Sequence, residues 1–148
     1  MKAYGVPASR AGMLPWDWAR ERLSKSHNYW FTTVRPDGVP HTMVVWGIWL
    51  EEAWYFSTSE RSRKGRNLEQ NQNCVVCTEN AAEAVIVEGT AHKLTQDEVP
   101  PQAFTDYKAK YGWALDPKLG PVYVVRSKTV FAMPEKQFPK AVTRWKFE

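Results

Sequence analysis

The sequence predicts a mainly β protein, a closed or nearly closed antiparallel β-barrel with flanking helices. Seven segments are rich in β-branched and aromatic residues, and short polar stretches separate them. Only three segments show helical spacing, and Pro36-Asp37-Gly38 supplies a turn between two of the strand-like segments. Many strands with few helices are typical of barrels and sandwiches. The length of 148 residues predicts a single domain, residues 1–148.

The composition narrows the classes of function. Hydrophobic residues make up 43% and charged residues 24%, as in ordinary globular proteins, and the net charge is +4. A mild positive charge without a long basic stripe suits a phosphorylated small molecule better than a nucleic acid. No apolar stretch approaches the roughly 20 residues of a membrane span, and residues 1–16 contain no apolar leader. We therefore expect a cytoplasmic protein with neither a membrane nor a nucleic-acid partner.

The first part of the chain is expected to form an arm, a helix and a three-stranded meander. Residues 1–15 hold Gly, Pro and Ser, which favours an extended N-terminal arm. Trp16–Lys25 has Trp16, Ala19 and Leu23 at helical spacing. Residues 39–50 are expected to form one long strand with an apolar residue at most positions on both faces. The full meander comprises residues 30–35, 39–50 and 54–58, with Glu51-Glu52 as its second turn.

The rest of the chain is expected to contain two helices and four strands. The helix of residues 62–71 has Leu68 as its only large apolar residue, so it needs a docking partner or a ligand. A second helix is expected over residues 98–111, with Phe104, Tyr107 and Tyr111 facing inward. The strands are residues 74–78, 84–94, 121–133 and 141–147.

The junction of residues 57–67 is the most informative stretch, because it places hydroxyls and cations between a strand and a helix. Arg63 and Lys64 lie in the first helical turn, where the helix dipole disfavours each cation by roughly 0.3–1 kcal/mol. A bound anion relieves this repulsion, and phosphate is the usual ligand. A solvated basic surface helix is the alternative. The stretch is not a Walker loop, and the chain has no G-x-G-x-x-G motif.

Other residue patterns point away from metal and hydrolytic chemistry. Cys74 and Cys77 have no second Cys pair, and on a strand they would face opposite sides, so core packing is expected. The three His residues lack metal-ligand spacing, although His41 lies beside the proposed ligand strand. There is no G-x-S-x-G motif and no evident carboxylate pair. We predict no metal site, and any chemistry is expected to be carried by a cofactor.

Three segments in the same order resemble one known family. Residues 30–46 (WFTTVRPDGVPHTMVVW), 55–68 (YFSTSERSRKGRNL) and 85–91 (VIVEGTA) are similar to the pyridoxamine 5′-phosphate oxidase-like, FMN-binding split-barrel superfamily. The ending TRWKF at residues 143–147 resembles the branch that includes coenzyme F420-dependent reductases. The resemblance covers most of residues 16–148 and is weak over residues 96–119.

This resemblance implies a six-stranded antiparallel split β-barrel that forms a homodimer, with two cofactor sites in the interface. It implies that the strand at Thr42–Val45 lies along the cofactor ring, that the Ser57 and Thr58 hydroxyls reach the cofactor, and that Arg63 and Lys64 hold its phosphate. Residues from the partner chain would close the site. The implied cofactor-binding residues are Thr42, Met43, Val44, Val45, Ser57, Thr58, Arg63, Lys64, Asn67, Arg144 and Trp145.

The sequence also departs from the family pattern. Pyridoxamine phosphate oxidases proper carry Arg at the position of Thr42 and an Arg-x-His motif near the C-terminus, and both are missing here. The prediction is therefore an FMN-dependent oxidoreductase that transfers hydride to or from a small planar substrate left unspecified, with no catalytic side chain named. The alternatives are an F420-dependent reductase of the same fold, for which Arg61 and Arg66 could bind the acidic tail, and a non-catalytic flavin- or haem-binding protein.

Overall fold

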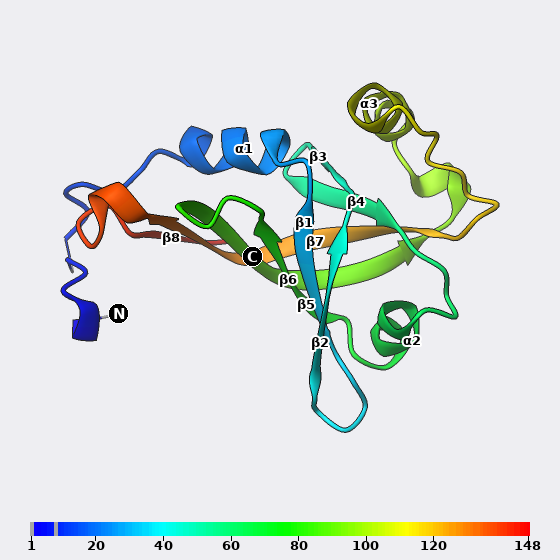
Figure 1. Cartoon of the computed structure of the whole chain (residues 1–148), viewed down its shortest axis with the longest axis horizontal. Coiled ribbons are helices and arrows are strands. Elements are labelled where there is room, and N and C mark those ends of the chain that lie inside the picture. The colour runs from blue at the N-terminus through cyan, green and yellow to red at the C-terminus, as the bar shows by residue number, and fades with distance from the viewer. Residues whose placement is uncertain (1, 8) are drawn as a thin grey trace.

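The computed structural model describes residues 2–7 and 9–148 and contains one antiparallel sheet of eight strands. The sheet order is β2-β1-β5-β6-β7-β4-β3, and β8 pairs with β7 outside this path. The sheet curls into a half-barrel with flanking helices, which confirms the predicted split-barrel class (Figure 1). The strands are β1 (Tyr29–Val34), β2 (Pro40–Val45), β3 (Ile48–Leu50), β4 (Ala53–Ser57), β5 (Asn73–Thr78), β6 (Glu83–Leu94), β7 (Val122–Pro134) and β8 (Thr143–Lys146).

Three α-helices flank the sheet at separate places. Helix α1 (Trp16–Lys25) runs along one side, α2 (Arg63–Gln70) lies beside the β1–β2 hairpin, and α3 (Pro101–Tyr111) lies at the far corner from β8 (Figure 1). Short 3₁₀ turns occur at η1 (Lys2–Tyr4), η2 (Gln96–Glu98) and η3 (Glu135–Gln137). None of the helices in the described part of the chain is long and apolar enough to span a membrane.

The prediction of one long strand over residues 39–50 is wrong, and this accounts for the eighth strand. The ladder from β2 stops at Val45 and a new strand begins at Ile48. A Cβ on Gly47 would lie 2.2 Å from the Trp54 ring, so the backbone packs directly against that indole. Tyr111 fixes the break, because its hydroxyl accepts from the Gly47 N–H and lies 3.0 Å from the Gly47 carbonyl. A tertiary contact, not the residue pattern, therefore divides the strand.

The helix predicted over residues 98–111 begins later than expected. Residues 96–98 form the separate turn η2, which Thr95 and Glu98 close with a capping box. The backbone at Val99 and Pro100 is extended, and α3 starts at Pro101. A residue before proline disfavours helical geometry, so two successive prolines set this boundary.

The sheet carries a hydrophobic cluster on each face, because neighbouring residues of β4 belong to different clusters. The larger cluster lies on the concave side and is covered by α1, and the smaller one lies on the convex side and is covered by α3. Ala19 and Leu23 of α1 join the larger cluster around Phe31, Trp54 and Phe56. Ala103 of α3 joins the smaller cluster around Tyr55, with Phe104 and Tyr107 packed against it. Tyr111 is also buried, as predicted for this helix face. Cys74 is a buried free thiol, in agreement with a core role.

Candidate functional site

The predicted anion site forms at the start of α2, where Ser62 caps the helix. The Ser62 hydroxyl accepts from the Gly65 N–H at 3.0 Å and donates to the Ser59 carbonyl at 2.7 Å. Since Ser62 has only one hydroxyl proton, the Thr58 hydroxyl must donate to Ser62 across their 3.0 Å contact. The cap satisfies the Gly65 N–H, whereas the N–H groups of Arg63 and Lys64 lie in the first turn and have no intrahelical acceptor.

Gly65 allows the strand-to-helix turn to pack against the helix. A Cβ at this position would lie 2.4 Å from the Ser59 carbonyl oxygen and 3.0 Å from Glu60. No larger residue fits without moving this turn. The sequence Ser-Arg-Lys-Gly therefore combines a cap, two cations and a close backbone approach within four residues.

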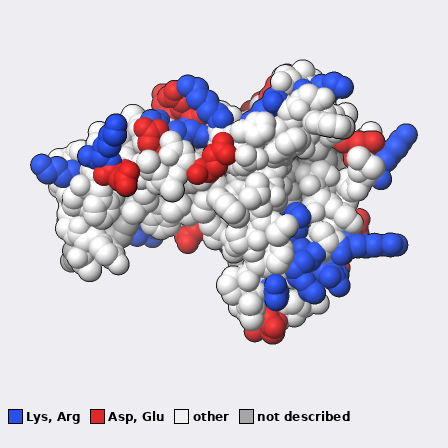
Figure 2. All heavy atoms as spheres, viewed as in Figure 1, with Lys and Arg blue, Asp and Glu red and all other residues white. Residues whose placement is uncertain are grey.

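The cations at this helix start have no acidic counterpart. Helix α2 has no acidic residue in its first turn, and within the described residues no carboxylate forms a salt bridge with Arg63 or Lys64. Lys64 is half-buried, and loss of solvent lowers the pKa of its amine. Lys and Arg side chains gather at the end of the molecule where α2 lies beside the hairpin (Figure 2). The repulsion is uncompensated, which is the property expected of an anion site.

Asn67 links α2 to strand β1 rather than facing solvent. Its side chain is fully buried, and its Nδ2 donates to the Thr33 hydroxyl at 2.9 Å. Its Oδ1 is buried without a partner among the described residues. Thr33 pairs directly with His41 on β2, so the two side chains share the face that α2 covers. His41 was not among the predicted cofactor-binding residues, and neither was the nearby Arg35.

Strand β2 presents alternate residues to opposite sides, so the four predicted ring residues do not act alike. Met43 and Val45 pair with the buried Phe31 and Tyr29 and face the core side. Thr42 and Val44 face the convex side, where Thr42 lies 2.8 Å from the Thr32 hydroxyl. Because β2 ends the sheet order, its outer edge has free backbone N–H and C=O groups. A ring beside β2 can contact all four residues only through this backbone edge.

The Ser57 hydroxyl is committed to the protein. It lies 3.3 Å from the Gly120 carbonyl and 3.1 Å from the Pro121 carbonyl, and it can donate its proton to only one of them at a time. With the Thr58 proton directed to Ser62, both predicted hydroxyls shape the turn, and cations and backbone N–H groups remain as the donors for an anion.

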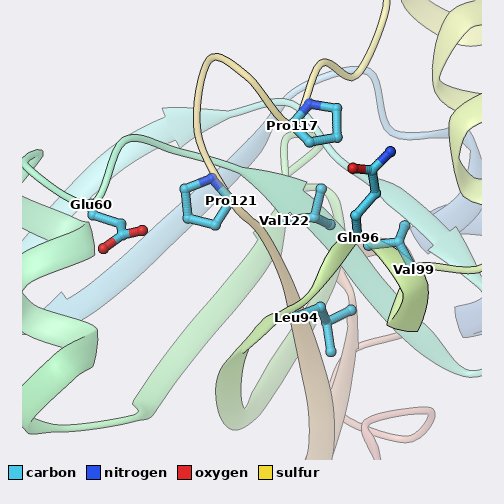
Figure 3. Close-up of a pocket in the computed structure, with 7 residues that line it drawn as sticks. All are labelled: Glu60, Leu94, Gln96, Val99, Pro117, Pro121 and Val122. Atoms are coloured by element: carbon cyan, nitrogen blue, oxygen red, sulfur yellow. The ribbon is translucent and has the colours of Figure 1, made fainter.

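A pocket of about 300 Å³ lies on the far side of this turn, beside Pro121 (Figure 3). Glu60 and Gln96 are its polar side chains, and Leu94, Val99, Pro117, Pro121 and Val122 complete the lining. Glu60 carries negative charge and pairs with Lys93 at 3.4 Å. An anion is therefore disfavoured in this pocket, and the basic side of the turn remains the candidate site.

Arg144 and Trp145 do not join this site within one chain. They lie on β8, which is at the opposite end of the molecule from α2 (Figure 1). Trp145 pairs with Val130 and packs against Trp16 with ring centroids 5.1 Å apart, so this half-buried side chain lies against the larger hydrophobic cluster. Arg144 pairs with Phe131 on the other face and is exposed.

No cluster of three potential metal ligands from His, Cys, Asp and Glu occurs within residues 2–7 and 9–148. His92 contacts the Thr90 hydroxyl at 3.0 Å. His27 packs edge-on against the rings of Trp46 and Tyr111. The remaining histidine, His41, lies among cations, which disfavour a metal ion.

A comparison with protein families gives one decisive match. The model of the pyridoxamine 5′-phosphate oxidase family matches residues 16–140, which is most of the chain. The chain belongs to the pyridoxamine 5′-phosphate oxidase family. The part of the chain that matches the family includes α2 and the β1–β2 hairpin, and it ends before β8. The anion site is therefore built entirely from the family region, whereas Arg144 and Trp145 lie outside it.

Solved structures show how widely the fold of this family is shared. An F420 reductase has a TM-score of 0.62 and 22% identity, and the match covers 75% of this chain and 94% of that one. A haem-binding protein from Mycobacterium smegmatis has a TM-score of 0.71 and 19% identity, covering 90% of this chain and 59% of that one. A haem storage protein from Vibrio cholerae gives 0.64 and 15%, covering 79% and 91%. No curated protein sequence matches significantly.

Proposed function

We propose that this protein is an FMN-dependent oxidoreductase that transfers hydride to or from a small planar substrate. The observation that carries the proposal is the uncompensated positive charge at the capped start of α2, beside Lys64 and Arg63. A terminal phosphate matches this charge and the two free N–H groups. Membership of the pyridoxamine 5′-phosphate oxidase family supports the same class of cofactor.

The residues present fit FMN in a simple division of tasks. Arg63 and Lys64 would bind the phosphate through their side chains and first-turn N–H groups. The free backbone edge of residues 43–45 would hydrogen-bond the ring and set its orientation. The bound flavin supplies the hydride-transfer chemistry itself. The protein contributes position and charge.

Coenzyme F420 is the second candidate, and two exposed arginines favour it. Arg61 precedes the cap and Arg66 follows the first turn, and neither forms a salt bridge within the described residues. FMN ends at its phosphate, whereas the acidic tail of F420 would extend to such additional cations. The similarity of the fold to an F420 reductase is consistent with this alternative. A haem- or flavin-carrying protein without catalysis is a third possibility, suggested by the haem-binding neighbours.

We also propose that the working form is a homodimer, because the convex face of the sheet carries an apolar row. In this row, each residue is directly opposite the next one on the neighbouring strand, from β2 through β1, β5 and β6 to β7. The row consists of Val44, Trp30, Cys77, Ile86 and Phe131, and Arg144 on β8 follows Phe131. Val44 and Trp30 are each 48% exposed, which is high for large apolar side chains that lie side by side. A second copy on this face would bring its own Arg144 near the edge strand.

The test compares ligands that differ only in the phosphate. FMN and riboflavin are titrated against the wild-type protein and against Arg63→Ala with Lys64→Ala. Two lost charge-assisted contacts correspond to at least about a hundredfold weaker FMN binding. We expect the double variant to bind FMN no better than riboflavin while its circular dichroism stays unchanged. The control, Arg61→Ala with Arg66→Ala, should keep FMN affinity within a few-fold and weaken F420 much more.

Mass spectrometry of the small molecule released by heat identifies the native ligand directly. Released FMN supports the FMN-dependent enzyme, and released F420 supports the F420-dependent reductase. Released haem with a Soret band supports the non-catalytic haem-binding protein. Unchanged FMN affinity in the Arg63→Ala, Lys64→Ala variant would refute the phosphate assignment.

A further inference from the structure

His41 lies at the anion site in an unusual setting. It is on β2 directly opposite Thr33, whose hydroxyl accepts from the buried Asn67 of α2. Directly paired residues of antiparallel strands have Cβ atoms about 4.5–5.5 Å apart on the same face. The imidazole therefore lies on the face that α2 covers. Its Nδ1 is buried and has no hydrogen-bond partner among the described residues.

Only cations act on this imidazole. They are Arg35 at the end of β1 and Arg63 and Lys64 from the first turn of α2, and no acidic side chain in the described part of the chain opposes them. Partial burial, together with these three cations, lowers the pKa of His41 below its usual 6.5. In the ligand-free protein His41 is thus neutral at pH 7, although a ring nitrogen is available at the site.

We propose that His41 is a further binding residue of the anion site, which takes up a proton from solvent when a dianion binds and then donates a hydrogen bond to it. This inference rests on the proposed function, because it uses the same phosphate site. Proton uptake adds a fourth positive group only when the ligand is present. The site thereby avoids the full repulsion of four cations in the free protein.

The sign of the pH dependence follows from linkage. A bound dianion favours the imidazolium and raises the pKa of His41 above its value in the free protein. Between these two values, binding takes up a proton, so the affinity rises as the pH falls. Each unit of difference between free and bound pKa is a factor of ten in affinity. A phosphate ester itself has a second pKa of about 6, so a non-titrating probe is needed.

The first experiment follows the imidazole signals of the wild-type protein by NMR from pH 4.5 to 8. Sulfate is the probe, with sodium chloride at matched ionic strength as the control for screening. There are three His residues, and the signal missing in His41→Gln identifies His41. We expect sulfate to raise the His41 pKa by about one unit relative to chloride. An equal His41 titration in sulfate and chloride would overturn the proposal.

The second experiment measures FMN affinity at pH 6 and pH 8. On going from pH 6 to pH 8 the wild type should lose affinity relative to His41→Gln by a factor that approaches ten. Parallel pH dependence of the two proteins, with FMN still bound through Arg63 and Lys64, contradicts the role of His41 alone. Absence of FMN binding at any pH contradicts the proposed function instead, and the sulfate titration then still decides the role of His41.

Discussion

At the scale of single residues, the candidate site depends on the hydroxyl protons of Thr58 and Ser62 and on the absence of a side chain at Gly65. The Ser62 hydroxyl donates its only proton to the Ser59 carbonyl, so Thr58 donates to Ser62. Ser62 accepts from the Gly65 N–H, and the N–H groups of Arg63 and Lys64 stay free for a ligand. Gly65 has no Cβ, so the Ser59 carbonyl approaches the helix closely. Hydrogen bonds within the chain and this close backbone approach therefore hold the turn that precedes the cations.

We predict that Gly65→Ala lowers both stability and FMN affinity. In an ordinary helix this change stabilises by up to about 1 kcal/mol, but here the new methyl group would lie 2.4 Å from the Ser59 oxygen. Displacing the turn should cost about 1–3 kcal/mol of the free energy of unfolding, measured by urea denaturation. Glu69→Ala on the exposed side of α2 is the matched control and should change neither quantity. A stabilised Gly65→Ala protein would show that the turn moves freely.

Residue patterns predict part of this site and not the rest. Two cations in the first turn of a predicted helix indicate an anion-binding helix start, because these signals lie within a few residues. The Ser62 cap was not predicted and appears only in the structure. The link from His41 through Thr33 to Asn67 depends on how α2 docks on β1. The packing of Trp145 against the larger cluster likewise depends on the register of β8 against β7. Local spacing contains no information on either contact.

At the scale of elements, Lys110 connects α3 to the break between β2 and β3. Its Nζ donates to the Tyr29 hydroxyl at 2.9 Å and to the Gly47 carbonyl at 3.2 Å. Burial lowers the pKa of this amine to about 8, and the negative charge of Glu79 offsets the effect only in part. The helix thus fixes the end of the proposed ring strand through a lysine that is costly to keep charged.

We predict that stability rises between about pH 8 and pH 10 because of Lys110. The unfolded chain holds this proton up to a pKa near 10.5, whereas the folded chain releases it at about 8. The unfolded state therefore binds more protons in this window, so the free energy of unfolding increases with pH. Urea denaturation at each pH should show a smaller rise for Lys110→Met. The same rise in both proteins would exclude Lys110 as its source.

Some boundaries between strands are set by local turn residues, and others are set by contacts with distant elements. The Pro36-Asp37-Gly38 turn and the Glu51-Glu52 connection were predicted correctly, because turn residues act locally. Even so, Glu51 and Glu52 both have positive φ, at 48° and 66°, which the sequence did not indicate. Glu52 accepts from Trp16 Nε1 and Arg20 Nε of α1, so contacts from another element help hold this turn. The break at Gly47 arises in the same way from Trp54 and Tyr111.

At the scale of the whole molecule, the part of the convex face that α3 does not cover remains open. The apolar row from Val44 to Phe131 runs across five strands, and its Trp30 is 48% exposed. The predicted homodimer would bury this row and place two sites at one interface. This part of the prediction came from the family resemblance, because the face becomes continuous only once the strand order is known.

We predict that the wild type is a dimer at micromolar concentration and that Trp30→Lys is a monomer with an intact fold. A charge in the centre of a closed apolar interface is strongly unfavourable, whereas the exposed side chain contributes little to the single chain. Trp113→Lys is the matched control, since Trp113 is 68% exposed in the loop before β7 and should leave the dimer intact. Light scattering gives the mass of each protein. A wild-type monomer that binds FMN tightly would contradict the shared site.

Strand β7 has a consequence for the order in which the molecule can assemble during synthesis. It pairs with β6, β4 and β8, and its Val122, Val124, Tyr123 and Val125 contribute to both hydrophobic clusters. Until the ribosome has released residues 122–134, β3 and β4 have only each other as sheet partners, and an isolated hairpin is marginal in water. The nascent chain therefore carries the cation-rich α2 while residues 71–121 are still being added, before the strand that pairs with its entry turn is made.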